Sequence, residues 1–206
     1  MAENRLAASV YVDDIVLVGD SIDEIHSVKH LLDQTFKIKD LGQLRYFLGF
    51  EIAQSNTGIF FNQRKYTLDL LEDSGFLASK PSAVPFDPNT KLSANDGQPL
   101  EDPTSYRHLI GRLIYLTNSR PDIAYVVQHL SQYVSNPWLP HYQAAIRILR
   151  YLKVVPAKGL LFSASINLKL SAFADSDWAC CPDTKRYVTG YCVILGSSLL
   201  CWKSKK

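Results

Sequence analysis

The strongest constraint on the fold is a pair of strand-like runs that only two residues separate. Residues 9–12 and 15–18 are mostly β-branched or aromatic side chains, which favour pleated strands. Asp13 and Asp14 connect the runs, so the spacing predicts a β-hairpin with two adjacent carboxylates at its tip. Because Mg²⁺ prefers carboxylate oxygens as ligands, this tip is a candidate metal site. An ordinary turn is the alternative, since aspartate is common in turns.

A helix and a second pair of strands are expected after the hairpin. Ser21 and Glu24 have the spacing of a capping box, which marks the start of a helix. Apolar residues then recur with helical spacing up to Phe36. The next predicted elements are strands over residues 46–53 and 59–62 and a helix over residues 65–74.

The second half of the chain begins with a change in composition. Prolines fall among Ser, Asn, Asp and Gly between residues 80 and 103, which predicts an extended linker. Apolar periodicity then predicts three helices, and Gly159 is expected to close this helical group. Strands are predicted over residues 168–174, 190–195 and 199–202. Together these elements predict an α+β fold.

Composition and charge limit the class of protein. Hydrophobic residues make up 47% of the 206 residues and charged residues 20%, which is typical of a globular protein. No apolar run approaches the ~20 residues that a membrane helix needs, so no membrane partner is expected. The net charge is +2, yet residues 105–160 hold seven basic residues against one acid, Asp122. Such a segment is suited to a phosphate backbone, and a solvated helix face is the alternative.

The cysteines favour a reducing compartment. The sequence has four of them, Cys180, Cys181, Cys192 and Cys201, without a C-x-x-C pair. Zinc-type spacing with histidine is also absent. The pattern is therefore typical of reduced thiols in an intracellular protein.

Two N-terminal segments resemble parts of a polymerase. Residues 11–14 (Tyr-Val-Asp-Asp) resemble the Y-x-D-D box of reverse transcriptases. Residues 47–52 (Phe-Leu-Gly-Phe-Glu-Ile) resemble the primer-grip strand pair of the same palm. The helix expected between them fits the spacing of that domain.

Later segments extend the resemblance in the same order. Residues 106–116 and 119–124 resemble the Y-R-x-x-x-G-x-L-x-Y-L and R-P-D-I-A signatures of copia-type LTR-retrotransposon Pol polyproteins. Residues 144–153 resemble the next helix of that family, and residues 174–179 resemble the start of its RNase H domain. The ordered set covers nearly the whole chain, which therefore resembles the C-terminal part of a copia-type reverse transcriptase with the start of RNase H.

The resemblance implies a division of the chain into four segments. We expect a palm remnant with a β-hairpin and a small antiparallel sheet, a linker, a helical thumb or connection region, and an incomplete RNase H-like sheet. In order, these segments cover residues 1–80, 81–103, 104–160 and 161–206.

The resemblance also implies an activity and a set of site residues. The parent activity is RNA-directed DNA polymerisation by two-Mg²⁺ phosphoryl transfer, with Asp13 and Asp14 as metal ligands and Tyr11 beside the primer end. Asp175 matches the first metal-binding aspartate of RNase H. The residues expected to contact the primer–template are Phe50, which positions the primer, and Arg107, Arg112, Arg147 and Arg150, which contact phosphates.

The same resemblance implies that this chain by itself lacks part of the catalytic apparatus. The palm strand with the third aspartate would precede Met1, and the later RNase H carboxylates would follow Lys206. We therefore expect no primer extension by residues 1–206 alone. The partners implied are an RNA or DNA primer–template and further Pol segments, in a cytoplasmic particle or the nucleus. The alternative function is non-enzymatic: weak nucleic-acid binding by a stranded fragment, or no function.

Overall fold

The computed structural model describes most of the chain. The described residues are 5–87, 89–95, 97–165, 167–177 and 187–205. The chain divides into two compact units, Met1–Arg45 and Tyr46–Lys206, which are described separately. None of the helices among the described residues is long and apolar enough to cross a membrane.

The first unit consists of the predicted hairpin and helix. Strands β1 (Leu6–Tyr11) and β2 (Asp14–Gly19) are antiparallel, and Tyr11 pairs with Asp14. Helix α1 (Ile22–Phe36) begins where the capping box predicts, because the Ser21 hydroxyl accepts a hydrogen bond from the Glu24 N–H at 3.4 Å. No side chain of residues 5–45 is fully buried.

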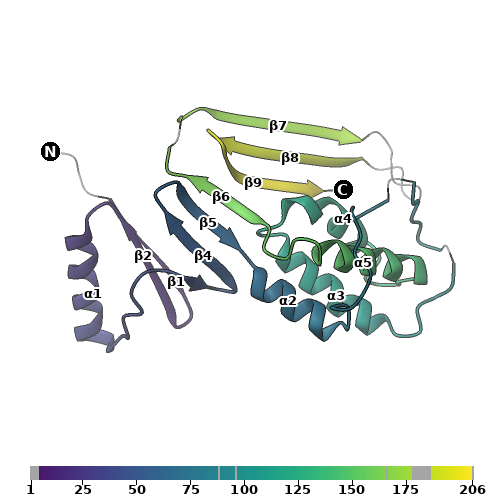
Figure 1. The fold of residues 1–206 in the computed structure, drawn as a ribbon, viewed down its shortest axis with the longest axis horizontal. Coiled ribbons are helices and arrows are strands. Elements are labelled where there is room, and N and C mark those ends of the chain that lie inside the picture. The colour runs from purple at the N-terminus through teal and green to yellow at the C-terminus, as the bar shows by residue number, and fades with distance from the viewer. Residues whose placement is uncertain (1–4, 88, 96, 166, 178–186, 206) are drawn as a thin grey trace. The chain divides into compact units, whose positions relative to one another are not determined.

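The second unit begins with a sheet that includes an unpredicted strand. The sheet order is β3 (Tyr46–Phe47), β4 (Phe50–Ser55), β5 (Gly58–Asn62) and β6 (Gly159–Ser163), and all neighbours are antiparallel. Figure 1 shows β6 beside β5, although four helices separate the two strands in the chain. Gly159 follows the helical group, as predicted, but the strand that begins at this residue was not predicted. This glycine opens β6, and a Cβ here would lie 2.0 Å from the Phe61 carbonyl oxygen.

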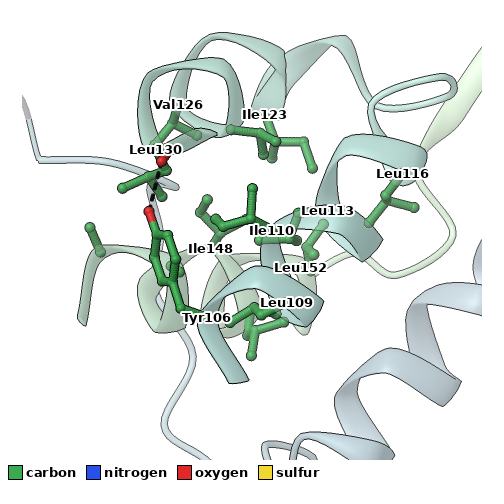
Figure 2. Close-up of a cluster of buried hydrophobic side chains, with 14 of the residues drawn as sticks. Tyr106, Leu109, Ile110, Leu113, Leu116, Ile123, Val126, Leu130, Ile148 and Leu152 are labelled. Carbon is green, nitrogen blue, oxygen red and sulfur yellow. Dashed lines mark hydrogen bonds between the residues drawn. The ribbon is translucent and has the colours of Figure 1, made fainter. Parts of the chain in front are cut away.

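The helical predictions are confirmed with small shifts at the ends. Helix α2 (Arg64–Asp73) follows β5, and it is followed by α3 (Pro103–Leu116), α4 (Pro121–Ser131) and α5 (Leu139–Leu152). Their apolar faces form one buried cluster, in which the side chains of α3, α4 and α5 point toward one another (Figure 2). The Tyr106 hydroxyl donates to the Leu130 carbonyl at 2.8 Å within this core.

The proline-rich segment packs against these helices. Leu92 is buried in the helical core, and its carbonyl accepts a hydrogen bond from the Tyr133 hydroxyl at 3.0 Å. The His141 ring contacts the Ser93 carbonyl at 2.9 Å, and Pro99 forms a β-bridge with Trp138. The described residues of the segment form bends and turns, and the segment is part of the second unit.

The three predicted C-terminal strands form a separate sheet. The order is β7 (Leu170–Asp177), β8 (Val188–Leu195) and β9 (Ser198–Lys205), with antiparallel neighbours. The predicted divisions at residues 80, 103 and 160 all fall inside the second unit. The structure is thus mixed α and β with small antiparallel sheets, while the assignment of its segments to palm, linker, connection and RNase H stays a prediction.

Candidate functional site

The two adjacent aspartates lie at the tip of the first hairpin. Both side chains are exposed, but the turn lies one residue earlier than predicted: Val12 and Asp13 form the loop and Asp14 begins β2. Val12 has a φ of +50°, at the loop position where type II′ turns prefer glycine. A β-branched residue is strained in this region, so the tip stores conformational energy.

The donor set at this tip fits a magnesium ion in part. Mg²⁺ is commonly held by one or two carboxylates, with water and substrate phosphates in the remaining positions. Asp13 and Asp14 supply two hard, exposed oxygen donors on the chain's first hairpin. In the part of the chain that the structure describes, no three His, Cys, Asp or Glu side chains cluster closely enough to hold a metal. Tyr11 ends β1 opposite Asp14 and is also exposed.

The segment that resembles the primer-grip strand pair forms two antiparallel strands, β3 and β4, and a tight turn between them interrupts the strand predicted over residues 46–53. Phe47 pairs with Phe50, and the two residues between them have positive φ: Leu48 at +47° and Gly49 at +75°. Positive φ at both central positions is typical of the two-residue turns that suit antiparallel strands. Phe50 is half-buried, and its ring lies 6.3 Å from the ring of Tyr115 on α3.

Two of the four predicted phosphate-binding arginines lie on α3 and already have internal partners. Arg107 donates from Nε and Nη2 to the Val134 and Ser135 carbonyls, at 2.7 and 3.0 Å. Arg112 donates from Nη1 to the Asp73 carboxylate at 2.7 Å. Both arginines line one groove of about 620 Å³, which α2, α3 and α5 border.

The other two arginines lie on α5, beside the proline-rich segment. Arg147 donates to the Val84 carbonyl at 3.4 Å, and its Nη1 lies 4.0 Å from the Asp87 carboxylate. Arg150 is exposed, and its carbonyl accepts from the Ser82 N–H. The structure therefore groups the arginines in two pairs, which contact different segments.

A fifth arginine, which the sequence analysis did not assign, is the centre of a buried polar network. Arg120 is 1% exposed and donates from Nε and Nη2 to both carboxylate oxygens of Asp122, each at 2.9 Å. The Tyr151 hydroxyl and the Lys158 ammonium also contact Asp122, at 2.7 and 3.1 Å. Burial raises the pKa of Asp122, but the hydrogen bonds from Arg120 and Tyr151 outweigh it and lower the pKa to about 2.

This network gives the Arg-Pro-Asp-Ile-Ala segment, residues 120–124, a structural role. Arg120 immediately precedes α4, and its Nη1 donates to the Val155 carbonyl at 3.1 Å, beyond the end of α5. The segment therefore ties the start of one helix to the chain that follows another. A Pro at the first helical position strengthened the prediction of α4. Asp122 is only two residues from Arg120, but the other members of the network come from a distant segment: Tyr151, Val155 and Lys158.

Asp175 lies on β7 and is exposed. Its Oδ1 accepts a hydrogen bond from the Ser176 N–H at 2.9 Å. The residue lines a groove of about 360 Å³ between α4 and the C-terminal sheet, together with Tyr125, Phe173 and Trp202. The last two residues of the predicted RNase H motif, 178 and 179, lie outside the described residues, as do Cys180 and Cys181.

Comparison with known families identifies the N-terminal part of the chain. Residues 1–88 match the family model described as reverse transcriptase (RNA-dependent DNA polymerase). This match includes both the hairpin with Asp13 and Asp14 and the turn at Leu48 and Gly49. No solved structure has significant similarity to the chain.

Individual proteins with similar sequences identify the family more closely. The retrovirus-related Pol polyprotein from transposon RE1 of Arabidopsis thaliana is 43% identical over 197 residues, which cover 96% of this chain and 13% of that protein. The Pol polyprotein from transposon TNT 1-94 of Nicotiana tabacum is 31% identical, over 98% of this chain and 16% of its own length. An uncharacterised mitochondrial protein of Arabidopsis thaliana is 38% identical, over 96% of this chain and 82% of its own length. The chain belongs to the copia-type retrotransposon Pol polyprotein family.

Proposed function

We propose that this chain contributes to RNA-directed DNA polymerisation as part of a retrotransposon Pol protein. The observation that carries the proposal is the exposed Asp13-Asp14 pair at the tip of a short hairpin, within a segment that matches reverse transcriptases. The chain spans only 13% and 16% of the two Pol polyproteins named above. The activity is therefore proposed for the longer assembly to which these residues contribute.

In this proposal the hairpin provides metal ligands. Asp13 and Asp14 would bind Mg²⁺ through their carboxylates, and further ligands would come from water, nucleotide phosphates and other Pol segments. Bound Mg²⁺ supplies charge stabilisation for phosphoryl transfer and lowers the pKa of the attacking primer hydroxyl. Tyr11, which pairs with Asp14, would lie beside the primer end and limit how it approaches the carboxylates.

The second unit would hold the primer–template. The turn at Leu48 and Gly49, with Phe50 behind it, would contact the primer strand. Arg150 is the best placed of the four arginines for a phosphate, since it is exposed, whereas the guanidinium of the other exposed arginine, Arg107, donates to two backbone carbonyls. Arg107, Arg112 and Arg147 would contribute only through donors that their internal hydrogen bonds leave available. Asp175 would serve an RNase H-type metal site when later carboxylates join it.

Manganese binding, detected by paramagnetic broadening of amide NMR signals, tests the metal site. Mn²⁺ replaces Mg²⁺ at oxygen sites, and we expect the amides of residues 11–15 to broaden first. The double variant D13N/D14N removes both charges and should abolish this selective broadening. The control D23N/D33N removes two exposed carboxylates of α1 and should leave it unchanged.

Two results would contradict the proposed metal role. One is broadening of the hairpin that persists in D13N/D14N, and the other is no preference for the hairpin in the parent chain. Retained duplex binding without hairpin metal binding would favour the non-enzymatic, nucleic-acid-binding alternative.

A further inference from the structure

The side chain of Tyr115 on α3 reaches the turn between β3 and β4. Its hydroxyl donates a hydrogen bond to the Leu48 carbonyl. Its ring packs edge-on against Tyr66 of α2, with centroids 5.0 Å apart, and lies 6.3 Å from the ring of Phe50. One side chain therefore connects the turn to two helices of the second unit.

The turn itself is shaped to accept this contact. A Cβ at Gly49 would lie 2.9 Å from the Tyr115 hydroxyl oxygen, so a larger residue would displace the tyrosine. Gly49 also has a φ of +75°, which favours glycine for a second reason. Leu48 has positive φ without being glycine, and such a conformation persists only when neighbouring groups hold it.

Further contacts hold Tyr66, against which the Tyr115 ring packs. The Tyr66 hydroxyl donates to the Arg112 carbonyl at 3.3 Å. The Arg112 guanidinium lies 5.6 Å from the centre of the Tyr66 ring and pairs with Asp73. Tyr115 thus connects helices α2 and α3 to a turn that lies outside the main hydrophobic core.

We propose that Tyr115 is a positioning residue, which fixes the backbone of the Leu48–Gly49 turn and so determines where this turn contacts the primer strand. The inference rests on the proposed function, because it requires that the turn contact the primer. Tyr115 itself does not touch the primer. The substitution Tyr115→Phe keeps the aromatic ring and removes the hydroxyl that donates to the Leu48 carbonyl.

The experiment compares Tyr115→Phe with Tyr106→Phe in the full chain. Tyr106 lies on the same helix, and its hydroxyl also donates to a backbone carbonyl, that of Leu130 at 2.8 Å. Both variants lose one tyrosine–carbonyl hydrogen bond, but only Tyr115→Phe loses one at the turn. We expect hydrogen exchange of the Phe50 amide to accelerate about three- to ten-fold in Tyr115→Phe and to stay unchanged in Tyr106→Phe.

A photo-crosslinking readout connects turn mobility to the primer. The probe is a DNA primer with an aryl azide near its 3′ end, annealed to an RNA template, and crosslinks are mapped by mass spectrometry. We expect the parent chain and Tyr106→Phe to crosslink at residues 46–51. The crosslink yield of Tyr115→Phe at these residues should be at least three-fold lower. A parent chain without crosslinks at these residues would refute the proposed function together with the inference. Equal yields in parent and Tyr115→Phe would overturn the inference alone.

Discussion

Replacing Asp122 by asparagine removes the charge that neutralises the buried Arg120. Asp122 is 17% exposed in its side chain and accepts hydrogen bonds from Arg120, Tyr151 and Lys158. Removing one partner of a buried ion pair leaves an uncompensated charge and costs about 3–5 kcal/mol. Because Asp122 is partly exposed, we expect a loss of about 3 kcal/mol in the free energy of unfolding. The control D73N breaks the Arg112 pair, whose carboxylate side is 61% exposed, and should cost about 1 kcal/mol or less.

The same carboxylate makes stability depend on pH in a predictable direction. Its pKa is about 2 in the folded protein and 3.8 without the fold, so folding favours the ionised form. The stabilisation is therefore fully present above about pH 4–5 and is lost as pH falls toward 2. At about 1.4 kcal/mol per pKa unit, this group contributes on the order of 2 kcal/mol.

Urea unfolding followed by circular dichroism at 222 nm measures both effects, because the network lies within the helical part of the second unit. The parent chain should lose stability between pH 5 and pH 2.5, and D122N should lose about 2 kcal/mol less over the same interval. The reasoning is refuted if D122N is no less stable than D73N at pH 7. It is also refuted if both proteins show the same slope with pH.

Three further outcomes test other parts of the structure. Gly159→Ala should lower the free energy of unfolding by about 2 kcal/mol or more, since its Cβ would collide with the Phe61 carbonyl. Gly111→Ala in α3, where the added Cβ meets open space, should be neutral or slightly stabilising. Urea titration measures both variants. Val12→Gly should slow hydrogen exchange in the hairpin by relieving about 1 kcal/mol of strain, and unchanged or faster exchange would contradict the strained turn. Arg150→Gln should reduce the salt-dependence slope of primer–template binding by about 1 in fluorescence anisotropy without changing stability, and an unchanged slope would exclude its phosphate contact.

Local sequence patterns predicted the elements whose stability depends on near neighbours. Ser21 and Glu24 are three residues apart, so their capping interaction could be read from the sequence and is present in α1. The apolar periodicity of α3, α4 and α5 also predicted their buried faces. The exposed Asp13 and Asp14 followed from strand-like runs on both sides.

Patterns that depend on distant partners were predicted less well. Residues 46–53 have the composition of one strand, yet Leu48 and Gly49 turn the chain, with Tyr115 of α3 bound at the turn. Gly159 has the signal of a helix terminator, but it opens a strand that pairs with β5. The contacts that hold these two conformations have no local signature, because the partner atoms come from segments far away in the sequence.

The sequence by itself determined the family, the hairpin with its carboxylate pair, and the faces that the helices bury. These properties depend on residue type and short-range spacing, which a single chain displays directly. Only the tertiary structure decided which charged side chains are available to bind a phosphate and which are held by internal hydrogen bonds. Arg107, Arg112 and Arg120 are alike in the sequence, but packing brings each to a different distant partner: Val134, Asp73 and Val155, respectively. Long-range packing chooses among chemically equivalent side chains because a hydrogen bond forms only where the fold brings donor and acceptor within about 3 Å.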